Sequence, residues 1–383
     1  MDSVTYGHRL LNYTSSVNLK IAHVITRFNR GGTTSWIIEL SRGLIARGHE
    51  VLIYCGPTKL PEVENSGLSE FNFRKINPLS KSLNPVHLCK AIYSLRKMIK
   101  LDQPTVLISH TSHAGIIAKL TIATFAKNQR PELVHTYHGH FLHGYFNKVG
   151  LLIYKLIERA TRNLADGYII SGQRVYEELL RAKILSRKTS TCLINPPLSN
   201  IPTDLIPKGK FPSLTLGWLA RIAPIKRFDR VIELAQKFPS HTFLVGGDFE
   251  MSEREFAGLP SNITMQGWVK SDDFWPQCDI ALCTSDNEAQ PISLLEAATY
   301  GIPALTTNVG GCSDAVLHME TGIVVDPSID QLAVGLQVYI ENPELISTLG
   351  QNAQIRATLE YTKESCALGH EAYFTLLLKS LRK

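Results

Sequence analysis

Two glutamates lie eight positions apart, Glu288 and Glu296, in the segment SDNEAQPISLLE at residues 285–296. The proline in this segment and the later Gly301 predict a short helix over about 291–300. The first amides of such a helix have no partner within it, so they can bind an anion. Carboxylates on either side could accept hydrogen bonds from sugar hydroxyls. A phosphate between two sugars is a nucleotide-sugar, and the segment therefore predicts such a ligand.

Two cationic residues follow a predicted strand in LARIAPIK, Arg221 and Lys226. Ligands of open α/β domains bind at the carboxyl ends of strands, which would place both side chains at the binding edge. Fixed cations could neutralise a leaving diphosphate in place of a metal ion. The chain has no D-x-D pair, which also favours cationic side chains over a metal. The alternative is an ordinary solvated basic loop.

Glycine turns follow two further predicted strands. Gly31 and Gly32 lie between a strand over 20–25 and a helix over 35–47, where glycine lets the backbone approach an anion closely. Gly247 lies in a second glycine turn, with a weaker signal for phosphate approach. G-x-G occurs nowhere in the chain, which argues against a nicotinamide dehydrogenase.

Four histidines cluster at the end of another predicted strand: His135, His138, His140 and His143. A metal site is one interpretation, but carboxylate or cysteine partners at metal-ligand spacing are missing. The favoured interpretation is a strand-end loop in which one histidine contacts substrate. We therefore expect no metal and no other cofactor.

Length and composition indicate a cytoplasmic globular protein of two domains. The chain has 383 residues, 44% of them hydrophobic, and no apolar run long enough to cross a bilayer. The first thirty residues do not resemble a signal peptide. Its seven cysteines form no C-x-x-C pair, which fits a reducing compartment.

The charge is distributed unevenly. Residues 1–200 carry 26 basic and 12 acidic side chains, whereas residues 201–383 carry 14 and 22. The basic half is expected to meet an anionic membrane surface or a phosphorylated acceptor. Nucleic acid is not expected, because aromatic residues do not alternate with the basic ones. The basic amphipathic stretch over 88–100 fits either a membrane-surface helix or a helix packed on the sheet, and the second is favoured.

Strands and helices alternate along both halves, so each half is predicted to be a doubly wound α/β domain with a parallel sheet. The proline-rich segment 195–202 is the predicted linker. Predicted strands lie at 20–25, 51–55, 105–110, 132–136, 165–171, 214–219, 242–247 and 279–283.

These segments together resemble the retaining glycosyltransferases of family 4, the glycosyl transferases group 1, from about Ile21 to Tyr361. The most specific part is the order of R-x4-K (Arg221, Lys226), E-x7-E (Glu288, Glu296) and the following glycine pair at 310–311. The resemblance implies the GT-B fold, with two Rossmann-like domains facing across a cleft. It implies an N-terminal domain over 1–197, a nucleotide-sugar domain over 198–363, and a last helix, about 364–383, that returns to the first domain.

The resemblance also implies roles for individual residues. It implies a catalytic group in which His138 lies beside the transferred sugar, Arg221 and Lys226 neutralise the diphosphate, and Glu288 contacts sugar hydroxyls. It implies donor-binding roles for Gly31, Gly32, Gly247, Val269, Gln290, Pro291, Ile292 and Glu296. Of these, Glu296 would hold the ribose, Val269 would meet the base, and Pro291 would contribute no N–H.

The implied reaction moves a hexose or N-acetylhexosamine, with retention, from a nucleotide-sugar to a glycan or lipid-linked glycan acceptor in cell-surface polysaccharide synthesis. A UDP-sugar is the expected donor, and the expected location is the cytoplasm or the inner face of the membrane. Two alternatives are a nucleotide-sugar 2-epimerase and a non-catalytic nucleotide-sugar-binding protein of the same fold.

Overall fold

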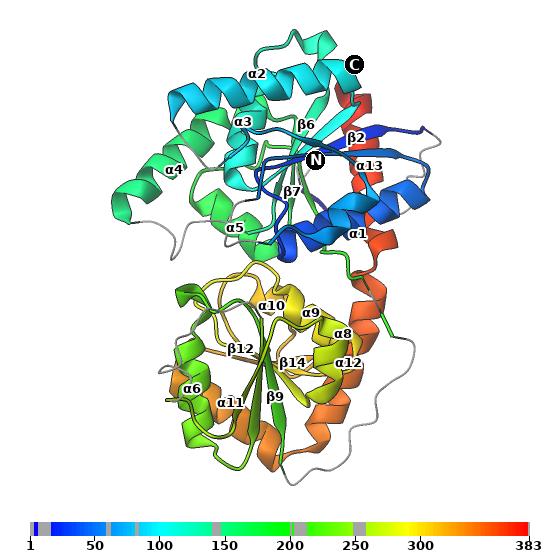
Figure 1. Ribbon diagram of the computed structural model, residues 1–383. Helices are drawn as coiled ribbons and strands as arrows, with labels where there is room; N and C mark the ends of the chain where they lie inside the picture. Colours follow the sequence, from blue (N-terminus) through cyan, green and yellow to red (C-terminus); the bar gives the residue numbers. More distant parts are fainter. Residues whose placement is uncertain are drawn as a thin grey trace. The chain divides into compact units, whose positions relative to one another are not determined.

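The computed structural model describes residues 4–6, 17–58, 63–80, 84–139, 147–199, 201–202, 213–247 and 258–381. The chain forms two compact units, shown in Figure 1. Unit 1 comprises Met1–Ser199 and Lys363–Lys383, and unit 2 comprises Asn200–Thr362. Each unit is built on a parallel β-sheet with helices against it.

The sheet of unit 1 has the strand order β1-β8-β7-β6-β5-β2-β3-β4. All of its pairings are parallel. Its elements are β1 (Val4–Tyr6), β2 (Lys20–Ile25), α1 (Gly32–Ala46), β3 (Glu50–Cys55), η2 (Ser66–Glu70), β4 (Asn72–Lys75), α2 (Pro85–Asp102), β5 (Val106–His110), α3 (Ser112–Ile122), η3 (Lys127–Gln129), β6 (Glu132–Tyr137), α4 (Lys148–Thr161), η4 (Arg162–Leu164), β7 (Gly167–Ile170), α5 (Gln173–Arg181), β8 (Thr191–Leu193) and α13 (Lys363–Leu381).

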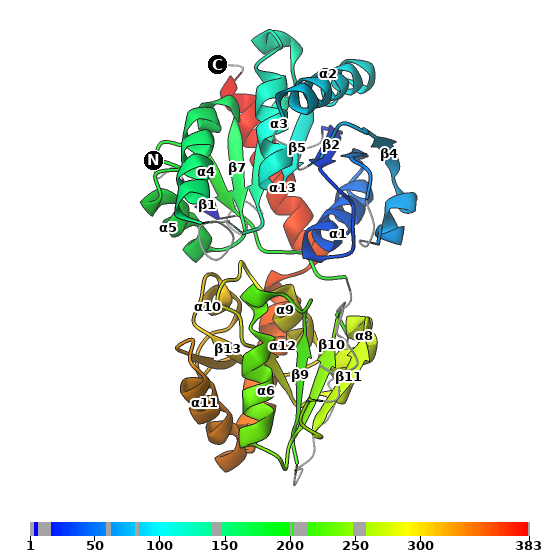
Figure 2. The same ribbon diagram turned by 60° about the vertical axis from the view of Figure 1, so that its left-hand side comes forward.

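Successive residues of each strand point to opposite faces of this sheet, and both faces are apolar. Ile21 and Ile108 belong to a core with α1 and α13, whereas their neighbours Ala22 and Leu107 belong to a core with α2 and α3. Figure 2 shows α3 and α4 on one side of the strands and α13 behind them. The buried strands are therefore continuous hydrophobic runs in the sequence.

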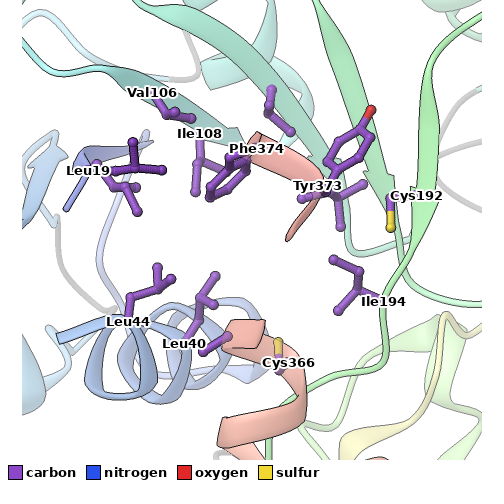
Figure 3. Close-up of a cluster of buried hydrophobic side chains, with 14 of the residues drawn as sticks. Leu19, Leu40, Leu44, Val106, Ile108, Cys192, Ile194, Cys366, Tyr373 and Phe374 are labelled. Atoms are coloured by element: carbon purple, nitrogen blue, oxygen red, sulfur yellow. The ribbon is translucent and has the colours of Figure 1, made fainter. Parts of the chain in front are cut away.

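The last helix, α13, is an integral part of unit 1. Its residues Cys366, Tyr373 and Phe374 are buried among side chains of α1 and the sheet (Figure 3). The Tyr373 hydroxyl accepts a hydrogen bond from the amide of Tyr168 at 3.1 Å. A Cβ at Gly43 of α1 would lie 2.8 Å from the Cβ of Ala367, so this glycine allows α1 and α13 to pack closely.

Unit 2 has the strand order β11-β10-β9-β12-β13-β14, again wholly parallel. Its elements are β9 (Thr215–Leu219), η5 (Pro224–Lys226), α6 (Phe228–Lys237), β10 (Thr242–Gly246), β11 (Ile263–Gly267), α8 (Ser271–Phe274), η6 (Trp275–Gln277), β12 (Ile280–Cys283), α9 (Ile292–Thr299), β13 (Ala304–Thr307), α10 (Cys312–Ala315), β14 (Gly322–Val325), α11 (Ile329–Glu341) and α12 (Glu344–Glu360).

Several element boundaries differ from the sequence prediction. α1 begins at Gly32, about one turn earlier than expected, so this glycine is helical. α9 begins at Ile292, and Pro291 is its N-cap rather than part of its first turn. Gly301 has φ +68°, as a C-terminal stop requires.

The apolar stripe of α2 is buried, as the favoured interpretation of the 88–100 stretch predicted. Ala91, Leu95 and Ile99 pack into the core beside the sheet. Among the described residues, no helix is both long and apolar enough to pass through a lipid bilayer.

Candidate functional site

The residues predicted from unit 2 gather at the carboxyl edge of its sheet. β9 pairs with β10 on one side and with β12 on the other, and the chain runs outward in both directions from this point. Such a reversal of strand order leaves a crevice where loops diverge, and ligands of open α/β sheets bind there. Lys226 follows β9 and Glu288 follows β12, so the two residues come from the two sides of the reversal.

Lys226 and Glu288 form an ion pair. Nζ of Lys226 lies 2.5 Å from Oε1 of Glu288. The Ser285 hydroxyl donates to the same Oε1 at 2.6 Å. The thiol of Cys283 is a more distant third donor to this oxygen, at 4.0 Å. These donors therefore fix the orientation of the carboxylate, and Lys226 carries a positive charge.

A buried hydrogen-bond chain supports the backbone at Lys226. Nε1 of Trp218 donates to the Thr284 hydroxyl at 3.1 Å, and this hydroxyl donates to the carbonyl of Lys226 at 2.9 Å. Trp218 is on β9 and Thr284 directly follows β12, so the chain ties the two loops together. Position 226 is thereby held by the core.

Glycines beneath the Glu288 loop allow it to lie close to the next turn. A Cβ at Gly310 would lie 1.9 Å from the carbonyl oxygen of Glu288, and one at Gly311 would lie 2.4 Å from that of Ala289. The amide of Gly311 donates to the Glu288 carbonyl at 3.0 Å. The glycine pair therefore determines how closely the Glu288 loop approaches the turn at 310–311.

The segment from Gln290 to Ile292 forms the start of α9. Gln290 and Pro291 are buried, and the carbonyl of Pro291 accepts the amide of Leu294 at 3.0 Å. The first turn of α9 contains no acidic residue. Its amino end thus presents the positive end of the helix dipole.

Glu296 lies on α9 beside α8. Burial, partly offset by a hydrogen bond from Ser271, raises the pKa of Glu296 to about 7. The nearby Asp272 carboxylate accepts the Tyr300 hydroxyl at 2.9 Å. Val269 precedes α8, and its Cγ1 would lie 2.8 Å from a Cβ at Gly246. The Glu296 and Val269 positions therefore border the same α8 segment.

Arg221 and Gly247 lie at the ends of the adjacent strands β9 and β10. Arg221 is exposed. Gly247 has φ +135°, and a Cβ there would lie 2.1 Å from the carbonyl oxygen of Ala220. Glycine is required at 247 because the two loops touch through their backbones.

In unit 1, Gly31 and Gly32 form the start of α1. Gly31 has φ +153°, and a Cβ built on it would meet nothing within 4 Å. None of the described side chains caps this helix, and its first turn contains no acidic residue. The side of Gly31 on which a Cβ would lie is therefore open.

A chain of three histidines runs from the middle of β2 to the carboxyl edge of the unit 1 sheet. Nδ1 of His23 lies 2.9 Å from Nε2 of His110, and Nδ1 of His110 lies 2.8 Å from Nε2 of His138. Burial, together with the neighbouring His370, lowers the pKa of His138 to about 3. A neutral imidazole has one donor and one acceptor, so the tautomers of the three rings are coupled. Trp36 of α1 packs edge-on against His138, with their ring centroids 4.6 Å apart.

His135 has a different role, because it points to the opposite face of the sheet. Its Nδ1 lies 2.9 Å from the Ser109 hydroxyl, and its ring packs under Gly115 of α3. Among the described residues, no three His, Cys, Asp or Glu side chains are placed to hold a metal ion. His140 and His143 lie outside the described residues.

Sequence reasoning missed the residues that support this site. Ser285 and Trp218 carry no motif, and His23 and His110 lie 115 and 28 positions before His138. The sequence did predict strands over 20–25 and 105–110, which contain His23 and His110. Their pairing in one sheet was the one signal that could have placed these histidines near His138.

Two family profiles match the chain. "Glycosyl transferases group 1" matches residues 210–356, and "Glycosyltransferase Family 4" matches residues 30–191. The chain belongs to the GT-B glycosyltransferases of the family 4 type.

Curated relatives of this GT-B glycosyltransferase include one component of the human phosphatidylinositol N-acetylglucosaminyltransferase, 28% identical over 82% of this chain and 66% of the relative. Another is the alpha-monoglucosyldiacylglycerol synthase of Acholeplasma laidlawii, 24% identical over 92% of this chain and 95% of the relative. The matched part spans about two thirds of the human relative and 62% of the 2-deoxystreptamine N-acetyl-D-glucosaminyltransferase of Niallia circulans.

Solved structures share the fold. Sucrose-phosphate synthase from Thermosynechococcus elongatus superposes with a TM-score of 0.79 and 18% identity, over 95% of this chain and all of that one. Anabaena HepE in complex with UDP and glucose superposes with a TM-score of 0.71 and 17% identity, over 95% of this chain and all of that one.

Proposed function

We propose that this protein transfers a hexose or N-acetylhexosamine from a nucleotide-sugar, foremost a UDP-sugar, to a glycan or lipid-linked glycan, with retention at the anomeric carbon. The Lys226–Glu288 ion pair at the strand-order reversal of unit 2 carries this proposal. In this pair, a cation that can bind a phosphate lies next to a carboxylate that can bind sugar hydroxyls.

The donor would occupy this edge in a defined order. Glu296 would accept hydroxyls of the ribose, and Val269 would lie against the base. The diphosphate would lie near Lys226 and Arg221, beside the turn at Gly247. The amides from Gln290 to Ile292 would meet the sugar and distal phosphate, with Pro291 contributing shape alone. Glu288 would hold the sugar hydroxyls.

From unit 1, Gly31 and Gly32 at the start of α1 would lie close to the diphosphate, and His138 would contact the transferred sugar. The His110 nitrogen at 2.8 Å fixes which ring nitrogen of His138 remains for the ligand. This role does not need a charged imidazole, in agreement with the low pKa of His138.

The proposed step breaks the bond from the anomeric carbon to the phosphate oxygen and forms one to the acceptor oxygen on the same face. The departing diphosphate takes the proton of the acceptor hydroxyl. Lys226 and Arg221 would stabilise the charge that develops on the leaving group, which is how preorganised donors lower a barrier. We propose that they do so without a metal ion.

A lipid-linked acceptor is supported by two relatives, whose names refer to phosphatidylinositol and to the synthesis of monoglucosyldiacylglycerol. The bound UDP of Anabaena HepE supports the uridine donor. The setting that we propose is the cytoplasm, at the inner face of the membrane.

Thermal unfolding with UDP, GDP or ADP, each with and without EDTA, tests the donor site. A ligand at a hundredfold its Kd should stabilise the fold by about 2.7 kcal/mol. Release of UDP from UDP-glucose, UDP-galactose and UDP-N-acetylglucosamine, with glycolipid acceptors, then tests transfer. A nucleotide shift without transfer to any acceptor would favour a binding protein, and loss of the shift in EDTA would overturn the metal-free site.

A further inference from the structure

Helix α4 carries an apolar stripe on its solvent side. Val149, Leu152, Ile153 and Leu156 are 67%, 56%, 51% and 53% exposed. Their spacing of three, four and seven positions places them on one face of the helix. Helices of water-soluble domains normally turn such a face toward the core, whereas this apolar face points to solvent. α4 lies at the outside of unit 1 in Figure 2.

A buried ion pair fixes the rotation of α4. Glu158 on the opposite face lies 2.8 Å from Nζ of Lys119, and both side chains are completely buried. The Tyr137 hydroxyl donates to the same carboxylate oxygen at 2.8 Å. Rotating the stripe inward would expose this pair and separate its partners, so the outward orientation belongs to the folded unit.

The exposed surface of α4 is basic. Lys148, Lys155 and Arg159 share one edge of the stripe, as their spacing of seven and four requires. The guanidinium of Arg159 is anchored to the carbonyl of Ala182 at 2.6 Å. Glu158 is the one acidic residue of this helix, and it is buried. The outer face therefore presents aliphatic side chains and positive charge.

We propose that α4 docks the protein on an anionic lipid surface, with the stripe among the acyl chains and the lysines at the headgroups. Interfacial helices combine an apolar face with adjacent basic residues in this way. The 14 residues of α4 span about 21 Å and can lie flat in the interface. The surface would bring unit 1 to a lipid-linked acceptor, and in that respect the inference rests on the proposed function.

Vesicle flotation of the full-length protein tests this docking surface. Binding is expected to equimolar phosphatidylcholine–phosphatidylglycerol vesicles, with much less to phosphatidylcholine alone, and added salt should weaken it. Lys148→Gln/Lys155→Gln should weaken binding about fivefold per lysine. Leu152→Ser/Leu156→Ser should weaken it by about tenfold or more.

Leu359→Ser is the matched control, because Leu359 is a 72% exposed leucine on α12 of unit 2. It should bind vesicles like the wild type. These side chains are exposed, apart from the half-buried Lys155, and none of them belongs to the core, so circular dichroism and the melting temperature should stay unchanged. Equal binding by the α4 variants and the wild type would overturn the inference.

A second outcome would also overturn it: no vesicle binding, together with a dimer that dissociates in Leu152→Ser/Leu156→Ser on sedimentation. The stripe would then be a contact between two copies of the chain. Vesicle binding needs no turnover, and the nucleotide-induced thermal shift needs no lipid. Failure of the docking surface is therefore distinguishable from failure of the donor site.

Discussion

Nζ of Lys226 lies 2.5 Å from Oε1 of Glu288, although 62 residues separate the two in the chain. Without ligand, each group neutralises the other. A diphosphate would compete with Glu288 for the ammonium group, while sugar hydroxyls would compete with Lys226 for the carboxylate. The pair is therefore suited to separate when a nucleotide-sugar binds, with each partner keeping a role.

Lys226→Ala should lower kcat by about 10² to 10³, because it removes a preorganised cation from the leaving group. Steady-state transfer assays with the donor found in the nucleotide screen give this value. Lys237→Ala on α6 is the control, since this exposed lysine pairs with the exposed Asp330, away from the site. Turnover of Lys226→Ala close to that of Lys237→Ala would contradict the assigned role.

Glu288→Gln should separate binding from turnover. It keeps the size of the side chain but frees Lys226 from its carboxylate, so free UDP should bind severalfold more tightly. Transfer should fall, because the amide accepts sugar hydroxyls more weakly than a carboxylate does. Calorimetry with UDP and a turnover assay measure the two effects. Weaker UDP binding would show that the carboxylate does not compete for Lys226.

Gly311→Ala should lower nucleotide affinity by lifting the Glu288 loop. Its φ is negative, so the effect is steric: the added Cβ would lie 2.4 Å from the Ala289 carbonyl oxygen. Gly322→Ala makes a matched clash, 2.5 Å from the Ala304 carbonyl oxygen, at the edge strand β14. Both variants should unfold at lower denaturant concentration, whereas only Gly311→Ala should lose UDP affinity by calorimetry at a temperature where both are folded.

Glu296 should make nucleotide binding depend on pH near 7. Burial raises its pKa from 4.5 to about 7, and the ionised form accepts hydroxyl hydrogen bonds more strongly than the protonated form. With a pKa of about 7, the ionised fraction falls about fivefold between pH 7 and pH 6, so UDP should bind up to about fivefold more weakly at pH 6. Glu296→Gln should flatten this dependence, and an unchanged profile would place the titrating group elsewhere.

Stability should respond to Glu296 in the opposite direction. The folded pKa lies above the unfolded one, so the contribution of this group is complete below pH 4.5 and is lost as the pH rises through about 7. Urea unfolding of wild type and Glu296→Gln at several pH values measures it. The wild type should lose unfolding free energy relative to the variant over that interval.

Many elements could be predicted from local sequence. The strands at 20–25, 215–219 and 242–246 are apolar runs before glycine or polar turns, and such runs fit a parallel sheet with both faces covered. Gly301 ended a helix where expected, because a left-handed residue needs glycine. The start of α1 was misplaced by one turn because Gly32 and the following threonines are weak helix formers.

The solvent-facing apolar stripe of α4 was not predicted from the sequence. The sequence drew attention to the basic stripe of α2, whose apolar residues the structure buries. The outward face of α4 depends on the pairing of Glu158 with Lys119, 39 positions away, and helical spacing alone cannot say which face points inward.

The sequence by itself determined which residues follow strands, and hence that Lys226, Glu288 and His138 would lie at sheet edges. Only the tertiary structure decided which of them meet. Strand order put β9 beside β12, and β2 beside β5 and β6 beyond it, giving the Lys226–Glu288 pair and the His23–His110–His138 chain. Strand order depends on packing between distant segments, which no local pattern records.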